Sequence, residues 1–257
     1  MKRVAVVTGA GRGLGRKIAE RLARRGYHVI ATDIDEGAAH VTAAVVEGTG
    51  IKQDVRDPDS HRTVARLAAE HGALAVWVNN AGVLAVGEAW SMDDASIRRQ
   101  VEVNLLGMIW GCNAATAAMQ TGTILNIASM SSIVPTPGLA VYGATKHGVV
   151  GYSLSLASEL RQAKRPITVS ALLPAAIKGD MTAAVQHDAA ASLLFSNGPL
   201  LSVDEVADAA LELVARPKLV RTLPSYRAAM IHLLRPFPSI GLPLLERFAK
   251  LGRKQQR

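Results

Sequence analysis

A tyrosine and a lysine lie four positions apart at Tyr142 and Lys146, a spacing that suits proton transfer. Residues four apart on a helix share one face, so the phenol and the ammonium group can reach the same small volume. A tyrosine has an ordinary pKa of about 10, and a neighbouring cation lowers that pKa toward neutrality. The pair therefore predicts a general base or acid. Taken alone, it is also explained by a packed tyrosine beside a solvated lysine.

A glycine-rich segment follows a short apolar run near the N-terminus. Residues 4–7 predict a strand, and Thr8-Gly-Ala-Gly-Arg-Gly-Leu-Gly15 predicts a turn that opens a helix ending near Arg25. Glycine permits positive φ and close approach of a phosphate, and a helix N-terminus offers unpaired N–H groups. The segment predicts a pyrophosphate site for a dinucleotide, with a plain tight turn as the alternative.

Asp33 ends a second predicted strand at 27–32. A carboxylate at this place accepts hydrogen bonds from the adenosine ribose and repels a 2′-phosphate, so it favours NAD over NADP. Arg12 acts in the opposite direction, because a guanidinium group can bind a 2′-phosphate; the alternative for Arg12 is a solvated loop residue. Since the repulsion from Asp33 acts at close range, we predict NAD, with NADP less favoured.

Polar and small residues follow two further strands. Asp54-Val55 comes after a third apolar segment and can bring a carboxylate to the adenine amino group. Asn79-Asn-Ala-Gly82 follows a strand at 73–78, and its small residues and amides suit a flat ring and a ribose, unless they form an ordinary turn. Asn104 lies in an apolar part of a helix predicted at 93–119, where an amide is unfavourable without a task. A local break or a polar relay is predicted there.

Strands and helices alternate along the rest of the chain. Further elements are predicted at 59–71, 123–128, 142–161, 167–173, 202–216 and 218–223. Residues 181–201 show no clear strand and predict a lid or substrate wall. The alternation predicts an α/β fold, with a single Rossmann-type doubly wound parallel sheet of about seven strands and helices on both faces. We expect a dinucleotide-binding and catalytic domain at 1–223 and a C-terminal extension of it at 224–257.

The composition excludes several classes of protein. The chain has 257 residues, of which 49% are hydrophobic and only 4% aromatic, so its core must be built from Ala, Val, Leu and Ile. Cys112 is the only cysteine, which excludes an intramolecular disulfide and a cysteine-cluster metal site, and we predict no metal. No signal peptide and no membrane-spanning run is recognised, so a cytoplasmic protein is expected.

The net charge of +8 is concentrated at the C-terminal end. Residues 218–257 hold nine Lys or Arg and one acid, Glu246, whereas residues 1–217 hold twenty of each sign. A neutral body argues against a nucleic-acid partner. The basic and apolar extension at 224–257 suits peripheral contact with an anionic membrane. Alternatively, it covers the substrate mouth or packs on a neighbouring subunit.

Taken together, these motifs resemble those of the short-chain dehydrogenase/reductase (SDR) family over nearly the whole chain. Segment 8–15 resembles its cofactor loop, segment 79–82 its central-sheet motif, and Tyr142-x-x-x-Lys146 its active-site helix. Ser129 stands thirteen residues before Tyr142, at the place of the family's catalytic serine, and Asn104 matches its fourth catalytic position. The order and spacing of these motifs make chance agreement negligible.

The resemblance implies hydride transfer between a nicotinamide cofactor and an alcohol or carbonyl. It assigns proton transfer to Tyr142 and lowering of its pKa to Lys146, which also binds the nicotinamide ribose. Ser129 would hold the substrate oxygen, and Asn104 would support a water chain to Lys146. The implied cofactor contacts are Gly9, Arg12, Gly13, Leu14, Asp33, Asp54, Val55, Asn80, Ala81, Gly82, Tyr142, Lys146, Pro174 and Ile177. A homo-dimer or homo-tetramer is also implied.

One departure from the family pattern follows Pro174. The family typically has a glycine next and then a threonine near the nicotinamide carboxamide, but this chain has Ala175 and Gly179 at those places. Thr182 is a neighbouring hydroxyl that could be displaced into the task.

The substrate is encoded less clearly. Apolar residues from Ile177 to Phe195 suggest a small apolar alcohol or ketone, such as a steroid, retinoid or fatty alcohol, although these side chains could instead pack on the body or on another subunit. The competing classes of function are a non-catalytic NAD-binding redox sensor and a membrane-recruited interaction protein on the same fold.

Overall fold

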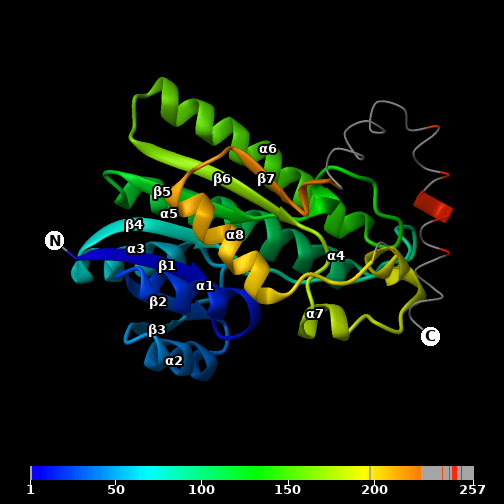
Figure 1. The fold of residues 1–257 in the computed structure, drawn as a ribbon, viewed down its shortest axis with the longest axis horizontal. Helices are drawn as coiled ribbons and strands as arrows, with labels where there is room; N and C mark the ends of the chain where they lie inside the picture. The colour runs from blue at the N-terminus through cyan, green and yellow to red at the C-terminus, as the bar shows by residue number, and fades with distance from the viewer. Residues whose placement is uncertain are drawn as a thin grey trace.

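Seven parallel strands form a single sheet in the order β3-β2-β1-β4-β5-β6-β7 (Figure 1). This computed structural model describes residues 2–196 and 198–226, together with positions 239, 243, 245–247 and 250. The strands are β1 (Arg3–Thr8), β2 (His28–Asp33), β3 (Thr49–Lys52), β4 (Ala73–Asn79), β5 (Gly122–Ile127), β6 (Ile167–Pro174) and β7 (Val220–Leu223). The predicted fold class is confirmed.

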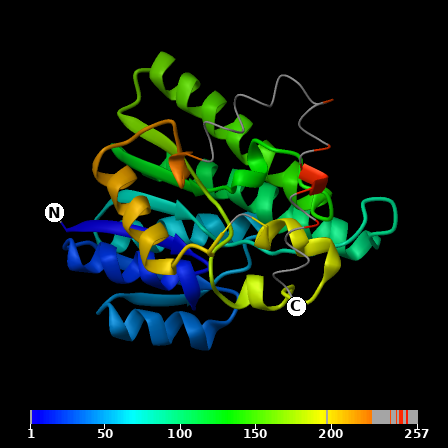
Figure 2. The same cartoon turned by 45° about the vertical axis from the view of Figure 1, so that its right-hand side comes forward.

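Helices cover both faces of the sheet (Figures 1 and 2). One layer consists of α1 (Gly13–Arg24), α2 (Glu36–Val45) and α8 (Val203–Ala215), and the other of α3 (Pro58–His71), α4 (Asp94–Val101), α5 (Gly107–Ala118) and α6 (Ala140–Gln162). Alternate residues of β1 serve the two cores, because successive side chains of a strand point to opposite faces. Val4 and Val6 pack in one core, whereas Ala5 and Val7 pack in the other.

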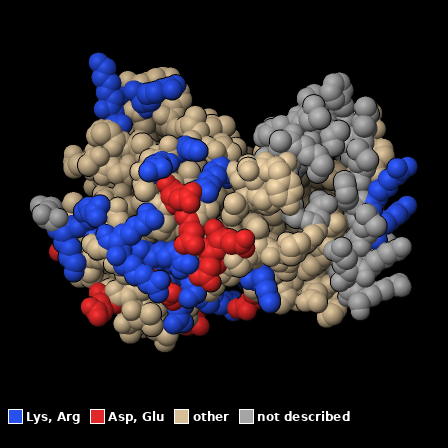
Figure 3. Space-filling model, viewed as in Figure 1, with Lys and Arg blue, Asp and Glu red and all other residues tan. Residues whose placement is uncertain are grey.

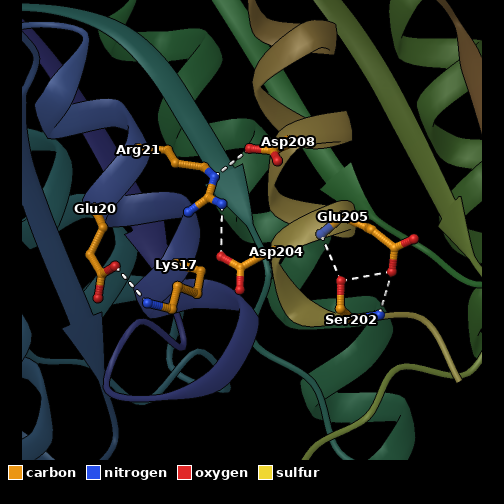
Figure 4. A network of polar contacts seen from close by, with 7 residues as sticks. All are labelled: Lys17, Glu20, Arg21, Ser202, Asp204, Glu205 and Asp208. Atoms are coloured by element: carbon orange, nitrogen blue, oxygen red, sulfur yellow. Dashed lines mark hydrogen bonds and ion pairs between the residues drawn. The ribbon is translucent and has the colours of Figure 1, made fainter.

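The helices α1 and α8 are joined by ion pairs on their outer surface (Figure 4). Arg21 of α1 donates hydrogen bonds to Asp208 (2.5 Å) and Asp204 (2.7 Å) of α8. A capping box begins α8, since the side chains and backbone amides of Ser202 and Glu205 cap one another. Figure 3 shows the same surface as a field of interspersed basic and acidic side chains. Opposite charges thus bring together two helices that are far apart in the sequence.

The strand order reverses beside β1, which makes this edge of the sheet a natural ligand site. The chain moves outward from β1 to β3 and then returns to β4 on the other side of β1. In such sheets ligands bind beyond the carboxyl ends of the strands at this switch point. Asp33, Asn80, Ser129 and Pro174 all lie at or just beyond strand ends on this edge.

The helix predicted at 93–119 is three consecutive elements. Between α4 and α5 the backbone forms a π-helix over Glu102–Leu106, and Asn104 lies at its centre, buried. The predicted local break is therefore confirmed. Segments of π-helix are rare in proteins overall, and those that occur often lie at functional sites.

The segment predicted as a lid contains short helices. These are α7 (Asp180–Ala183) and a 3-10 helix, Ala189–Phe195, and a single bridge joins Ile177 to Leu201. Beyond Tyr226, the predicted extension at 224–257 falls largely outside the described residues. No helix among the described residues has both the length and the apolar character needed to cross a membrane. Within that same part of the chain, no cluster of His, Cys, Asp and Glu is suited to a metal ion.

Candidate active site

The glycine loop is tied to the end of β4. Gly9 has a φ of +62°, and a Cβ on it would lie 2.8 Å from the Cα of Ala81, so only glycine fits. The side chain of Asn80 donates to the carbonyls of Thr8 (2.9 Å) and Gly9 (3.0 Å), while the Thr8 hydroxyl accepts from the backbone amides of Asn80 and Ala81. The Asn80 amide, predicted to contact cofactor, thus shapes the loop.

The N-terminus of α1 fits a dinucleotide pyrophosphate. Gly13 and Leu14 begin this helix, no side chain caps its first amides, and its first turn carries no acidic residue. Free N–H groups and the positive end of the helix dipole attract an anion. The Thr42 hydroxyl of α2 holds the loop from the other side, since it donates to the Ala10 carbonyl at 2.9 Å and lies 3.4 Å from the Gly11 carbonyl. The residues present therefore fit the predicted cofactor.

Asp33 is held beside this loop. Its carboxylate accepts from the backbone amides of Gly11 (2.9 Å) and Asp35 (3.1 Å). This places it at the end of β2, where the ribose of an adenosine would lie in a sheet of this type. Ile34, which was not predicted as a site residue, follows directly and leaves 58% of its surface exposed. Its signal in the sequence is an apolar residue between Asp33 and Asp35.

Arg12 reaches across to the lid segment. Its Nη1 lies 3.2 Å from Oδ2 of Asp180 at the start of α7, and both side chains are largely exposed. Arg12 is thus a solvated loop residue that also makes an exposed ion pair. Binding of a 2′-phosphate would compete with Asp180.

Asp54 and Val55 differ in what they offer to a ligand. The Asp54 carboxylate is paired with Arg56, with Nη2 to Oδ2 at 2.6 Å, and these hydrogen bonds hold the pKa of Asp54 below its ordinary value. Val55 lines a small hollow together with Ala81 and Val103. The structure therefore brings Val55 and Ala81 together, whereas the Asp54 carboxylate is engaged by its own loop.

The π-helix places Asn104 next to Gly82 and Lys146. Its side chain accepts from the Val83 amide (2.8 Å) and donates to the Val83 carbonyl (2.9 Å). A Cβ built on Gly82 would lie 3.3 Å from Oδ1 of Asn104 and 3.8 Å from Nζ of Lys146. These three predicted residues therefore surround one small volume.

The hydroxyl groups of Ser129 and Tyr142 lie close enough for Ser129 to act on the pKa of the phenol. Ser129 follows β5 and caps a 3-10 turn, Met130–Ser132, in which its Oγ accepts from the Ser131 amide at 3.1 Å. Tyr142 lies in the first turn of α6. Burial raises the pKa of Tyr142 above its ordinary value of 10, and the hydrogen bond with Ser129 offsets part of that rise. The predicted interval of thirteen residues thus brings the two hydroxyl groups together.

Lys146 does not produce the predicted lowering of the tyrosine pKa. Its Nζ donates to the Ile127 carbonyl at 2.9 Å and lies 5.7 Å from the centre of the Tyr142 ring. Burial lowers the pKa of Lys146 to about 8. The expectation was wrong for the protein's own groups, because loss of water disfavours the charged form of each residue more than this cation favours the phenolate.

The segment after β6 also differs from expectation. Pro174 is buried at the strand end, and Ile177 is half-buried beside it. The hydroxyl of Thr182 donates to the Ile177 carbonyl (2.7 Å) and accepts from the Gly179 amide (3.2 Å). This hydroxyl is engaged locally and does not replace a threonine at 179. A Cβ on Gly179 would meet nothing within 4 Å.

Three loops beyond the sheet edge are in contact. The Gly87 amide donates to the Gly138 carbonyl at 2.9 Å, and Gly138 approaches the Ala190 carbonyl so closely that a Cβ would lie 2.0 Å from that oxygen. The second of these loops leads directly into α6, the helix of Tyr142.

The chain is similar to known proteins over most of its length. The family described as short chain dehydrogenase matches residues 3–190. The 3-oxoacyl-[acyl-carrier-protein] reductase FabG of Escherichia coli is 37% identical over 215 residues, covering 80% of this chain and 87% of the relative. The reductase of the same name from Staphylococcus aureus is 35% identical over 198 residues, covering 73% and 80%.

A solved structure is similar over nearly the whole chain. A short chain dehydrogenase/reductase from Burkholderia phymatum, in complex with NAD, superposes with a TM-score of 0.82 at 26% identity and covers 93% of this chain and 95% of its own. The seven-stranded parallel sheet accords with this likeness in fold. The chain therefore belongs to the short-chain dehydrogenase family of oxidoreductases.

Proposed function

We propose that this protein interconverts an apolar alcohol and its ketone by hydride transfer, with Asn104, Ser129, Tyr142 and Lys146 as its catalytic residues. The observation that most directly supports the proposal is that Ser129, just after β5, lies near Tyr142, in the first turn of α6, at the carboxyl edge of the sheet. A serine, a tyrosine and a buried lysine converge where the strand order reverses. A redox sensor or a scaffold would need none of these three groups near one another.

The side chains divide the chemistry between them. A bound nicotinamide cofactor supplies or accepts the hydride. In alcohol oxidation, Tyr142 removes the hydroxyl proton and Ser129 donates a hydrogen bond to the substrate oxygen. Lys146, four residues further along α6, would bind the nicotinamide ribose of the cofactor. Asn104 fixes the backbone at Val83 beside Lys146 and so supports the path by which water exchanges a proton.

NAD is the proposed cofactor, with NADP less favoured. The Asp33 carboxylate is held by the glycine loop where it would repel a 2′-phosphate, and Arg12, the nearest loop cation, is paired with Asp180. The proposed contacts otherwise remain those of the glycine loop, Val55, Ala81, Gly82 and the start of the segment after β6. Similarity to a dehydrogenase that is in complex with NAD supports a nicotinamide cofactor.

The proposed substrate carries its carbonyl on an apolar group. Met181 leaves 44% of its surface exposed on α7, and half-buried Leu193 and Phe195 follow in the 3-10 helix. The relatives named 3-oxoacyl-[acyl-carrier-protein] reductase make a 3-oxoacyl thioester one member of this class to test. Steroid, retinoid and long-chain alcohols are the others.

A substrate panel tests the proposal. Each ketone or alcohol is offered with NAD(H) and with NADP(H), and the absorbance of the reduced cofactor is followed. Replacing Tyr142 by Phe should reduce turnover at least roughly 10²-fold while cofactor binding survives. The matched control is Tyr152→Phe, another tyrosine of α6, which bonds to Asn113 instead. A Tyr142→Phe enzyme with near-normal turnover would reject the assignment, and cofactor binding without turnover across the panel would favour a sensor.

We also propose a cytoplasmic homo-dimer or homo-tetramer whose extension at 224–257 contacts an anionic membrane peripherally. The support is the concentration of nine basic residues in 218–257. Flotation with anionic liposomes would compare the full chain with one truncated at Pro224, and equal failure to float would remove the membrane contact. Sedimentation of the full chain would give the oligomeric state.

A further inference from the structure

A chain of buried polar side chains runs beneath the turn that carries Asp54 and Val55. The Thr32 hydroxyl donates to Oε1 of Gln53 (2.5 Å), Nε2 of Gln53 donates to Nδ1 of His61 (3.1 Å), and Nε2 of His61 donates to the Val55 carbonyl (2.9 Å). Thr32, Gln53 and His61 expose at most 2% of their surface. None of them belongs to the catalytic group described above.

The hydrogen bonds run in one direction and fix the state of the imidazole. Because the Val55 carbonyl only accepts, Nε2 of His61 must carry the proton, which leaves Nδ1 to accept from the Gln53 amide. Burial lowers the pKa of His61, although the Val55 carbonyl and the carboxylates of Asp57 and Asp54 act against that fall. The neutral imidazole is the form that this chain of bonds requires.

Packing alone does not explain a histidine at this place. The other buried residues of α3 that face the core, Val64, Ala65 and Ala68, are apolar. A buried polar group lowers stability unless it is hydrogen-bonded, so an aliphatic residue would serve the core at least as well. His61 differs from these apolar neighbours in its hydrogen bond to the Val55 carbonyl.

The held carbonyl belongs to a turn clamped from two sides. Opposite His61, a Cβ on Gly107 of α5 would lie 2.9 Å from the Val55 carbonyl oxygen. The Ser60 hydroxyl also donates to the Asp54 carbonyl at 2.7 Å. The Val55 side chain is thereby directed to the hollow that it shares with Ala81 and Val103. The His61 side chain, the Ser60 hydroxyl and the close approach of Gly107 together hold the turn.

We infer that His61 is a positioning residue for the adenosine half of the cofactor, acting through Gln53 and the Val55 carbonyl. The inference rests on the proposed function, in which Val55 lies against that half. Without His61, the Val55 carbonyl is no longer held in place. The surface that this turn offers to the adenine is then no longer preformed. The nicotinamide half, bound near Tyr142 and Lys146, is supported by other elements.

Binding to the two halves of the cofactor tests this separately from catalysis. Calorimetry with His61→Leu should show Kd values for NADH and for ADP-ribose, which retains the adenosine half, that are roughly tenfold higher. The Kd for nicotinamide mononucleotide, which lacks that half, should not change. His71→Leu is the matched control, since it removes the other histidine of α3, which stacks on His28 at the opposite edge of the sheet. It should leave all three Kd values unchanged.

A double variant guards against misfolding. His61→Leu leaves the buried Gln53 amide without its acceptor, so Gln53→Leu/His61→Leu replaces both partners by apolar groups and should fold while binding ADP-ribose equally weakly. Unchanged ADP-ribose binding in either folded variant would overturn the inference, as would an equal loss with nicotinamide mononucleotide. If the unaltered chain bound neither NADH nor NADPH, the proposed function itself would fall, which is a different readout.

Discussion

Nη1 of Arg12 lies 3.2 Å from Oδ2 of Asp180, so an ion pair spans the gap between the glycine loop and α7. The two residues are 168 positions apart in the sequence. Their pairing joins the segment that should hold the pyrophosphate to the segment predicted as a lid. It also determines what charge the loop presents to the adenosine ribose.

Replacing Asp180 by Asn should increase the use of NADPH. Arg12 is released in this variant and can meet a 2′-phosphate, while Asp33 still repels it. Because the pair is exposed, the ratio of kcat/KM for NADPH to that for NADH should rise by no more than about fivefold. Adding Arg12→Ala to Asp180→Asn should abolish the gain. A ratio that rises equally in the double variant would show that Arg12 is not the cause.

Replacing Ser129 by Ala should shift the pH profile of alcohol oxidation upward. The hydrogen bond from Ser129 offsets part of the rise in the pKa of Tyr142, so its loss raises that pKa further. Oxidation needs the phenolate, and the rate therefore climbs with pH until Tyr142 is deprotonated. The inflection in kcat should move to higher pH, with about a 10²-fold lower rate below it.

Ser132→Ala is the control for that experiment. The Ser132 hydroxyl accepts from the Ser129 amide at 3.3 Å but makes no contact with the phenol among the described hydrogen bonds. The inflection in the pH profile of kcat should lie at the same pH in Ser132→Ala as in the unaltered enzyme. An unmoved inflection in Ser129→Ala would mean that another group titrates in the profile.

Replacing Lys146 by Met should stabilise the protein near neutral pH. Burial lowers the pKa of Lys146 from 10.5 to about 8, so its charged form is disfavoured in the folded state by up to about 3 kcal/mol. Between pH 8 and 10.5 the unfolded chain binds the proton that the folded protein has lost, and the stability of the unaltered protein therefore rises with pH. The advantage of Lys146→Met should shrink over that window.

Urea unfolding at several pH values would measure this change. The control is Lys218→Met, because Lys218 is exposed. Its stability should follow that of the unaltered protein at every pH. A Lys146→Met protein that is less stable at pH 7 would show that the bond to Ile127 outweighs the burial of the charge.

Replacing Gly179 by Thr should strengthen cofactor binding. A Cβ at this position meets nothing within 4 Å, and the φ of 172° is ordinary extended backbone. The added hydroxyl can restore a hydrogen bond to the nicotinamide carboxamide, so KM for the cofactor should fall by roughly three- to tenfold. Gly179→Ala adds the carbon without the hydroxyl and should have no such effect. Equal gains in both variants would assign the improvement to the backbone.

The sequence predicts the order of strands and helices well, because each of these elements is specified by its own residues. Alternating apolar runs and helical segments specify the parallel sheet, and the glycines specify the turn after β1. Even so, α2 was not predicted, although Asp35 is an N-cap signal whose carboxylate accepts from the Ala38 amide at 3.0 Å. The π-helix within the helix predicted at 93–119 was missed. The spacing of apolar residues does not reveal one additional residue in a turn.

The parts that the sequence could not specify depend on distant partners. Spacing correctly predicts that Ser129 meets Tyr142, but the direction of the tyrosine pKa depends on burial, which no motif encodes. The engagement of Arg12 by Asp180 and of Thr182 by the Ile177 carbonyl likewise arises only when the lid segment folds back. The Thr32–Gln53–His61 chain was missed because its members are scattered among residues that read as ordinary strand and helix.

The π-helix over Glu102–Leu106 makes the site sensitive to chain length as well as to residue type. Deleting one residue there would let the backbone return to an ordinary α-helix with α4 and α5 still in phase. It would remove the bulge that places Asn104 next to Gly82 and Lys146. Every substitution scan of this segment would overlook that constraint, and a scan of single-residue deletions would expose it.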